Sequence, residues 1–75
     1  MITAASLTNW FTYHPPTPQD AVAYTAIREA ALEFAQVVLS RTPEGADQSA
    51  ALRKIREAVM TANAAIACAS GGKEP

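Results

Sequence analysis

Two long apolar patterns, separated by a helix-breaking segment, constrain the fold of this chain most strongly. Apolar residues recur at alternating spacings of three and four over residues 24–38 and again over residues 52–69. Side chains at this spacing lie on one side of an α-helix, so each pattern predicts a long amphipathic helix. Between the patterns, Pro43 cannot continue a helix interior and Gly45 supplies a flexible turn. The chain is therefore expected to reverse there and to form an antiparallel αα-hairpin.

The two helices carry more apolar surface than one partner helix covers. The first seam consists of Tyr24, Ile27, Ala31, Phe34 and Val38, and the second consists of Leu52, Ile55, Val59, Ala62, Ile66 and Ala69. Beside these seams lie Val22, Ala30, Leu32 and Val37 on the first helix, and the small residues Ala51, Ala58 and Ala65 on the second. Because each helix has a spare apolar face, the sequence predicts an all-α fold whose hairpins assemble into a homo-oligomeric helical bundle.

A capping signal marks where the first long helix begins. Thr17 can cap the helix, Pro18 suits its first position, and Asp20 places a carboxylate near its positive end. The expected segments are an arm over residues 1–16 with a short helix over residues 3–10, long helices over residues 18–41 and 47–69, and a tail over residues 70–75 beyond the helix-ending Gly71 and Gly72. Together they are expected to make one helical-hairpin domain over residues 1–75.

A chain of 75 residues is short for a self-sufficient core. A domain of this size buries only about 60% of the surface that its unfolded chain exposes, so it needs further stabilisation. The single cysteine, Cys68, allows no intrachain disulfide and no multi-cysteine zinc site, and its simplest role is that of a small hydrophobe. Oligomerisation is the remaining ordinary route to stability, in agreement with the spare apolar faces.

Charge and hydropathy argue against several classes of protein. A net charge of −1 and a pI near 5.6 disfavour a protein that covers the phosphates of DNA or long RNA with a basic surface. A small anionic ligand held by one or two cations remains compatible with this charge. The first residues lack a basic n-region, and no apolar run approaches the ~20 residues of a membrane span. We therefore expect a cytoplasmic protein with no membrane partner.

Residues 11–18 form a proline-rich segment that carries an aromatic ring beside the only histidine of the chain. Each of its prolines fixes φ at about −65° and favours an extended preceding residue, so Tyr13 and His14 are held in few conformations. An aromatic ring on such a segment, with Arg28 on the following helix, would suit stacking on a nucleotide base and pairing with its phosphate. Packing of the Tyr13 ring in a core is the alternative.

The polar candidate residues each have a structural alternative. His14 has no second histidine or cysteine at ligand spacing, which favours a hydrogen-bonding or packing role over catalysis or metal binding. Arg28 is either a snorkelling or ion-paired surface residue or a phosphate fork. Asn63 lies in an apolar segment, where it either fixes the helix register by a hydrogen bond or contacts a ligand. Because the sequence offers no set of nucleophile, base and metal ligands, we expect neither an enzyme nor a cofactor.

Two ordered sequence blocks resemble a known family. The first combines Phe11-Thr12-Tyr13-His14-Pro15-Pro16 and Gln19 with Tyr24-Thr25-Ala26-Ile27-Arg28-Glu29-Ala30-Ala31. The second is Ala51-Leu52-Arg53-Lys54-Ile55-Arg56-Glu57-Ala58-Val59-Met60-Thr61-Ala62-Asn63-Ala64-Ala65-Ile66-Ala67. Over about residues 11–67 the chain is similar to the helical-hairpin domain shared by phage-encoded anti-CBASS and anti-Thoeris sponge proteins. Its shortness resembles the anti-CBASS member more than the longer anti-Thoeris one.

The resemblance implies a protein that sequesters cyclic oligonucleotide second messengers of bacterial antiphage signalling, in the cytoplasm of the host cell, without degrading them. It also implies a homohexamer with ligand pockets between subunits and cyclic dinucleotides as ligands. By the resemblance, Tyr13 would stack on a base, Arg28 would pair with a phosphate, and His14 would line the same pocket. Asn63 is a weaker correspondence, because its role in the family can be structural.

Two positions depart from the family pattern. Thr61 stands where an aromatic residue is expected, and Cys68 stands where an arginine is expected. Some members bind cyclic trinucleotides in a second pocket that uses a basic residue near that end, so the departure at Cys68 puts a second pocket in doubt. A hypothesis of another class also stays open, in which the hairpin is a structural assembly or adaptor protein without a small-molecule ligand.

Overall fold

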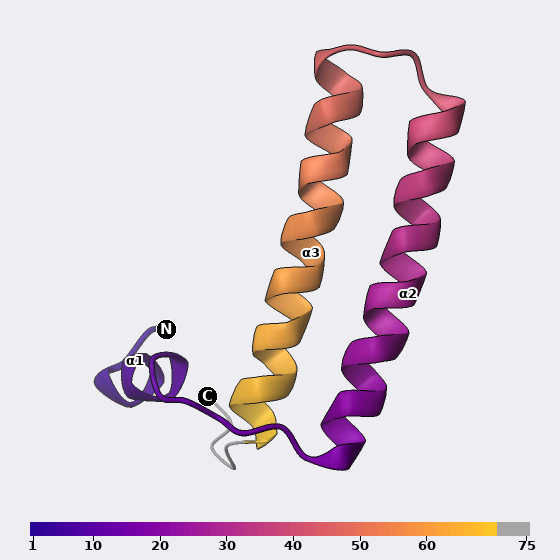
Figure 1. Ribbon diagram of the computed structural model, residues 1–75. Coiled ribbons are helices and arrows are strands. Elements are labelled where there is room, and N and C mark those ends of the chain that lie inside the picture. Colours follow the sequence, from indigo (N-terminus) through magenta and orange to yellow (C-terminus); the bar gives the residue numbers. More distant parts are fainter. Residues whose placement is uncertain (71–75) are drawn as a thin grey trace.

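The computed structural model describes residues 1–69 in full and the backbone of Ser70. These residues contain three helices. Helix α1 spans Ala4–Trp10, α2 spans Pro18–Arg41 and α3 spans Ala46–Ser70. Helices α2 and α3 run side by side in opposite directions, and α1 lies to one side of the α3 end that faces away from the hairpin turn (Figure 1). The predicted all-α hairpin is therefore confirmed, although α3 extends one residue beyond each end of the predicted range 47–69. The predicted helix stop at Gly71 and Gly72 and residues 71–75 of the predicted tail lie outside the described residues.

Side-chain caps set the ends of the helices, as the sequence predicts for α2. The Oγ1 atom of Thr17 accepts from the Asp20 backbone N–H at 3.0 Å, and the Asp20 carboxylate accepts from the Thr17 N–H at 3.0 Å. This reciprocal capping box pairs two backbone donors that a helix start otherwise leaves without partners. In the same way, Thr3 caps α1 by accepting from the Ser6 N–H at 3.1 Å.

The hairpin turn is closed by Gln48 from the first turns of α3. Its Nε2 donates to the backbone oxygens of Leu39, at 3.2 Å, and Thr42, at 3.1 Å. Both carbonyls lie at the end of α2, where a helix leaves its last acceptors without intrahelical partners. The Gln48 side chain thus ties the start of α3 to the end of α2.

The α2–α3 interface follows the predicted seams with two exceptions. The half-buried seam residues are Tyr24, Ile27, Ala31 and Val38 on α2 and Leu52, Ile55, Val59, Ala62 and Ile66 on α3. Phe34 was predicted to belong to this seam, but 58% of it is exposed, and Ala69 is also exposed. Ala35 is half-buried in the place of Phe34, because three turns of about 3.6 residues after Tyr24 lead nearer to residue 35 than to residue 34.

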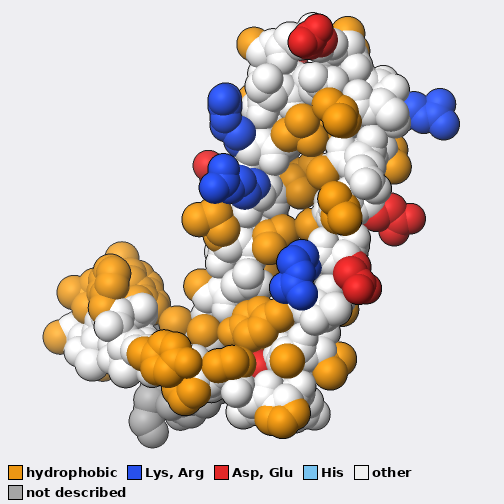
Figure 2. All heavy atoms as spheres, viewed as in Figure 1, with side chains coloured by type: hydrophobic (Ala, Val, Ile, Leu, Met, Phe, Trp, Pro, Cys, Tyr) orange, Lys and Arg blue, Asp and Glu red, His pale blue; other side chains and the backbone are white. Residues whose placement is uncertain are grey.

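The hairpin alone forms no closed core. None of the apolar side chains in the described part of the chain is fully buried, and the molecule is elongated, with extents of 44 × 29 × 16 Å. Figure 2 shows hydrophobic side chains gathered along the junction of the two long helices and over α1. Exposed apolar surface of this kind on a small protein is typical of a chain that binds a partner. The predicted homo-oligomer stays a prediction.

Helix α1 faces α3 with the side that the sequence does not predict. Its buried residues are the polar Ser6 and Asn9, whereas Leu7, Trp10 and Phe11 are exposed. Leu7 keeps 45% and Trp10 46% of its surface exposed, so the chain covers these two side chains only in part. A seven-residue helix presents all of its sides within two turns, so contacts to other elements decide its orientation.

Candidate ligand-binding site

The segment between α1 and α2, residues 11–17, presents Tyr13 to solvent and is called the arm from here on. After α1 ends, this extended segment passes the C-terminal end of α3 and leads into α2 (Figure 1). Tyr13 is 81% exposed, so its ring takes no part in a core of this chain. The packing alternative for Tyr13 is therefore not realised within the chain, and the ring face is accessible to a stacking partner.

His14, the next residue, is engaged by its own chain. Its Nε2 lies 2.7 Å from the backbone oxygen of Asn9. Because a carbonyl oxygen only accepts, the imidazole must carry its proton on Nε2 and donate it. The hydrogen-bonding role that the sequence favours for His14 is therefore confirmed, and the ligand-lining role implied by the resemblance stays a prediction.

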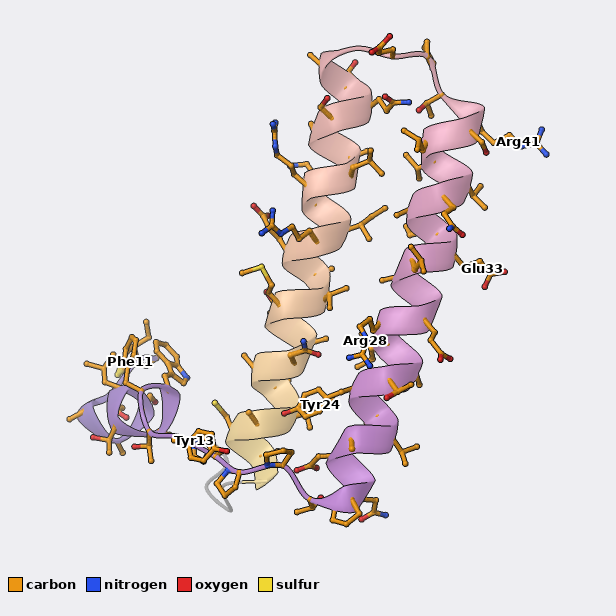
Figure 3. The ribbon with its side chains drawn as sticks, viewed as in Figure 1. Phe11, Tyr13, Tyr24, Arg28, Glu33 and Arg41 are labelled. Atoms are coloured by element: carbon orange, nitrogen blue, oxygen red, sulfur yellow. The ribbon has the colours of Figure 1, made fainter. Side chains whose placement is uncertain are left out.

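Arg28 extends its guanidinium from an exposed position on α2. Its Nη2 donates to Oγ1 of Thr25 at 3.4 Å, one helical turn earlier. Figure 3 shows Arg28 and Tyr24 on the side of α2 nearer to α3, with Tyr13 on the arm beyond Tyr24. A guanidinium carries five donors, and one weak contact to a hydroxyl leaves it able to grip an anion.

Asn63 contributes an acceptor without a partner. It is half-buried on α3, and its Oδ1 is buried but makes no hydrogen bond within the described residues. The predicted hydrogen bond that would fix the helix register is therefore not made by this oxygen. A buried acceptor without a donor costs about 1–3 kcal/mol, so a donor from a ligand or from another chain would be favourable there.

The fold brings these residues to the same half of the hairpin without joining them. Arg28 lies ten residues after Pro18, about 15 Å along α2 at 1.5 Å per residue. Asn63 lies seven residues before Ser70, about 10 Å from the adjacent end of α3. Within residues 1–70, no hydrogen bond connects Tyr13, Arg28 and Asn63 to one another. One chain thus presents binding groups on an open surface and not in an enclosed pocket.

A separate apolar groove of about 430 Å³ runs between the two long helices. Its lining residues are Ile27, Ala30, Ala31 and Phe34 from α2 and Ile55, Ala58, Val59 and Ala62 from α3. A groove lined by aliphatic and aromatic side chains provides no partners for phosphate oxygens. It suits an apolar helix face better than a charged nucleotide.

The described residues contain no group of three histidine, cysteine or acidic side chains that could hold a metal ion. They also contain no helix long and apolar enough to cross a membrane. The side chains that gather near the arm are aromatic, cationic and amide groups. Such groups are suited to stacking, charge pairing and hydrogen bonding.

Sequence reasoning missed two features of this region. Tyr24 is half-buried in the helix seam, as predicted, and in the view of Figure 3 it also lies between Tyr13 and Arg28. Asn9 was not singled out, although it binds both the arm and α3. Its signal is faint: with Thr3 as the cap, Ser6 and Asn9 recur three residues apart, which places them on one side of α1.

Comparison with known proteins gives a match to one family model. Residues 3–67 match the model described as Acb2/Tad1, hairpin domain. The match spans all of α1, the arm, all of α2 and most of α3. No match to this chain was found among curated proteins or among solved structures.

Proposed function

Because this chain belongs to the Acb2/Tad1 hairpin family, the family of anti-CBASS and anti-Thoeris sponge proteins, we propose that it binds and sequesters cyclic oligonucleotide messengers. In this proposal it acts in the cytoplasm of an infected bacterium, where it lowers the free messenger concentration and leaves the messenger intact. Cyclic dinucleotides are the proposed ligands, and cyclic trinucleotides are a second class to test. Residues 1–75 are taken as one domain.

The observation that carries this proposal is the exposed ring of Tyr13 in the same half of the hairpin as the exposed guanidinium of Arg28. A cyclic dinucleotide offers flat bases and two phosphates close together. Stacking of a base on an aromatic ring contributes about 1–3 kcal/mol, and a guanidinium pairs with phosphate through parallel hydrogen bonds. The proposed roles are therefore a base platform for Tyr13 and a phosphate fork for Arg28.

His14 and Asn63 complete the proposed site with smaller roles. His14 would border the pocket while its Nε2 stays bonded to the Asn9 oxygen. The Oδ1 of Asn63 would accept a hydrogen bond from a base amine or from a group of a neighbouring chain. Arg28 is the one arginine or lysine among the four proposed site residues, so the affinity is expected to depend mostly on Arg28.

The proposed assembly is a homohexamer with ligand pockets between subunits. Its support is the absence of any fully buried apolar side chain in the described chain, together with the open site on one subunit. Burial of the exposed faces by other copies would supply the stabilisation that a short hairpin lacks. Light scattering is expected to give a mass several times the 7.9 kDa of one chain, and a stable folded monomer would contradict the assembly.

Isothermal titration with a panel of cyclic dinucleotides tests the proposal directly. Arg28→Ala is expected to weaken binding by about ten- to a hundredfold, since a hydrogen bond to a charged group contributes about 1.5–3 kcal/mol. Arg41→Ala is the matched control, because Arg41 is also an exposed arginine of α2 but lies near the turn (Figure 3). Equal loss in both variants would show a general charge effect and remove Arg28 from the site.

A structural assembly protein without a ligand is the second candidate, favoured by the apolar groove between α2 and α3. Under this function, Ala58→Arg in the groove would disrupt the assembly, and no member of the nucleotide panel would bind the wild-type protein. Under the sponge function, the wild-type assembly binds at least one cyclic dinucleotide. Titration of the wild-type protein with the nucleotide panel therefore separates the two functions, since both include an assembly.

A further inference from the structure

The contact between α1 and α3 includes a hydrogen bond from a buried polar side chain of α1. Ser6 and Asn9, with exposed fractions of 8% and 9%, are the buried residues of the described part of the chain. Leu7 and Trp10 of the same helix remain exposed. Burial of an amide side chain is unfavourable unless it forms hydrogen bonds, so the bonds of Asn9 must sustain this contact.

Asn9 is bonded to the end of α3 through its side chain. Its Nδ2 donates to the backbone oxygen of Cys68 at 3.4 Å. Cys68 lies near the C-terminal end of α3, which spans Ala46–Ser70. The Asn9 amide thus bonds α1 to the backbone of α3.

The backbone oxygen of Asn9 is bonded to the arm on both sides of Tyr13. It accepts from the Thr12 N–H at 3.4 Å and from Nε2 of His14 at 2.7 Å. The residues before and after Tyr13 in the sequence are therefore both bonded to the same acceptor. Pro15 restricts the backbone of His14 as well. The ring of Tyr13 is exposed while the backbone that carries it is held.

We propose that Asn9 and His14 are positioning residues that place Tyr13 before a ligand arrives. Both residues would raise the affinity for the ligand by holding Tyr13 in place, and neither needs to contact the ligand. The inference rests on the proposed function in taking Tyr13 as the stacking residue. An arm that is already ordered avoids part of the ordering cost of binding, which corresponds to about three- to tenfold in affinity for each side chain fixed in advance.

Hydrogen exchange of the unliganded protein tests the positioning itself. In Asn9→Ala the Thr12 amide is expected to exchange about tenfold faster than in the wild type, because the loss of the Cys68 contact releases the helix end that carries the shared acceptor. Thr8→Ala is the control, as an exposed polar residue next to Asn9 on α1. Unchanged exchange in Asn9→Ala, or an equal rise in Thr8→Ala, would overturn the inference.

Titration of His14 variants with a cyclic dinucleotide tests how the imidazole acts. Glutamine can place an amide N–H near the position of Nε2, whereas alanine cannot. His14→Gln is therefore expected to retain affinity within about threefold, and His14→Ala to lose about three- to tenfold. A loss in His14→Gln as large as in His14→Ala would show that the ring itself contacts the ligand and would overturn the positioning role of His14.

A double-mutant cycle decides whether Asn9 acts through Tyr13. In a Tyr13→Leu background, which keeps measurable binding, Asn9→Ala is expected to cost less than twofold, because there is no ring left to position. Additive losses would overturn the inference. The exchange experiment needs no ligand, so failure of the proposed function, seen as no binding by the wild type, is distinguished from failure of the positioning, seen as unchanged Thr12 exchange.

Discussion

The hairpin and the arm with α1 are held together in opposite ways. Helices α2 and α3 meet along half-buried apolar seams and leave polar residues outside. Helix α1 is bonded to α3 by the side chain of Asn9 and leaves Leu7, Trp10 and Phe11 exposed. Apolar contact is proportional to area and tolerates small shifts, whereas hydrogen bonds require fixed distances and directions. The difference indicates that the hairpin supplies stability and the α1 contact supplies position.

The largest effect is expected from a charge placed in the hairpin seam. Ile55→Asp would bring a carboxylate into the half-buried interface without a partner, at a cost of about 2 kcal/mol or more. Far-ultraviolet circular dichroism is expected to show loss of helix at room temperature. Lys54→Asp, at the exposed neighbouring position, is expected to keep its helical signal. If Ile55→Asp keeps its helical signal, the apolar seams are not what holds the hairpin together.

The next effect concerns the apolar side of α1. Trp10→Ser is expected to weaken assembly, because the exposed part of this ring has no cover within its own chain. Light scattering at matched protein concentration should give a lower mass, while circular dichroism retains the helical signal of α2 and α3. If Trp10→Ser keeps the full assembly mass, the outward face of α1 is not an interface.

A smaller effect is expected from the capping box at the junction of arm and hairpin. Thr17→Ala removes the acceptor for the Asp20 N–H and is expected to cost about 1 kcal/mol. For a chain of this size that corresponds to a fall in Tm of about 4–8 °C, measured at constant concentration because assembly also affects Tm. Thr61→Ala, at an exposed position of α3, serves as control and should change Tm less.

The smallest effect is expected at the turn. Gln48→Ala removes the donors to the Leu39 and Thr42 carbonyls, which are exposed enough for water to replace them. A net loss of about 0.5–1 kcal/mol is expected, measured by chemical denaturation at one protein concentration. Gln36→Ala, on the exposed side of α2, provides the comparison. Equal changes in both variants would show that the side chain does not tie the turn.

The hairpin was largely predictable from the sequence, because its information is local and periodic. The breaker at Pro43 and the cap at Thr17 mark helix ends, and the 3-4 spacing marks the seam. The pattern failed at Phe34, since a helix of about 3.6 residues per turn brings the next residue, Ala35, to the interface instead. The orientation of α1 was not predictable, because its polar contact depends on a carbonyl at Cys68, far along the chain.

The candidate site was predictable in chemistry and not in geometry. For the Tyr13 ring beside two prolines, the sequence left display and core packing as alternatives, and the ring is 81% exposed. The bond from His14 to the Asn9 oxygen could not be inferred, because spacing alone does not show how a chain folds back after a helix. The Oδ1 of Asn63 has no hydrogen-bond donor within the described residues, and this could not be inferred either, because it depends on which side chains lie near it in the fold.

Recovery of a messenger after capture tests the central claim most directly. The protein would be incubated with an excess of a cyclic dinucleotide, separated from unbound ligand by gel filtration, and heat-denatured, and the released nucleotide would be measured by mass spectrometry. The sponge account predicts intact cyclic dinucleotide in a fixed ratio to protein, even after long incubation. The account would be contradicted if the protein retained no member of the cyclic dinucleotide panel, or if linear product were recovered.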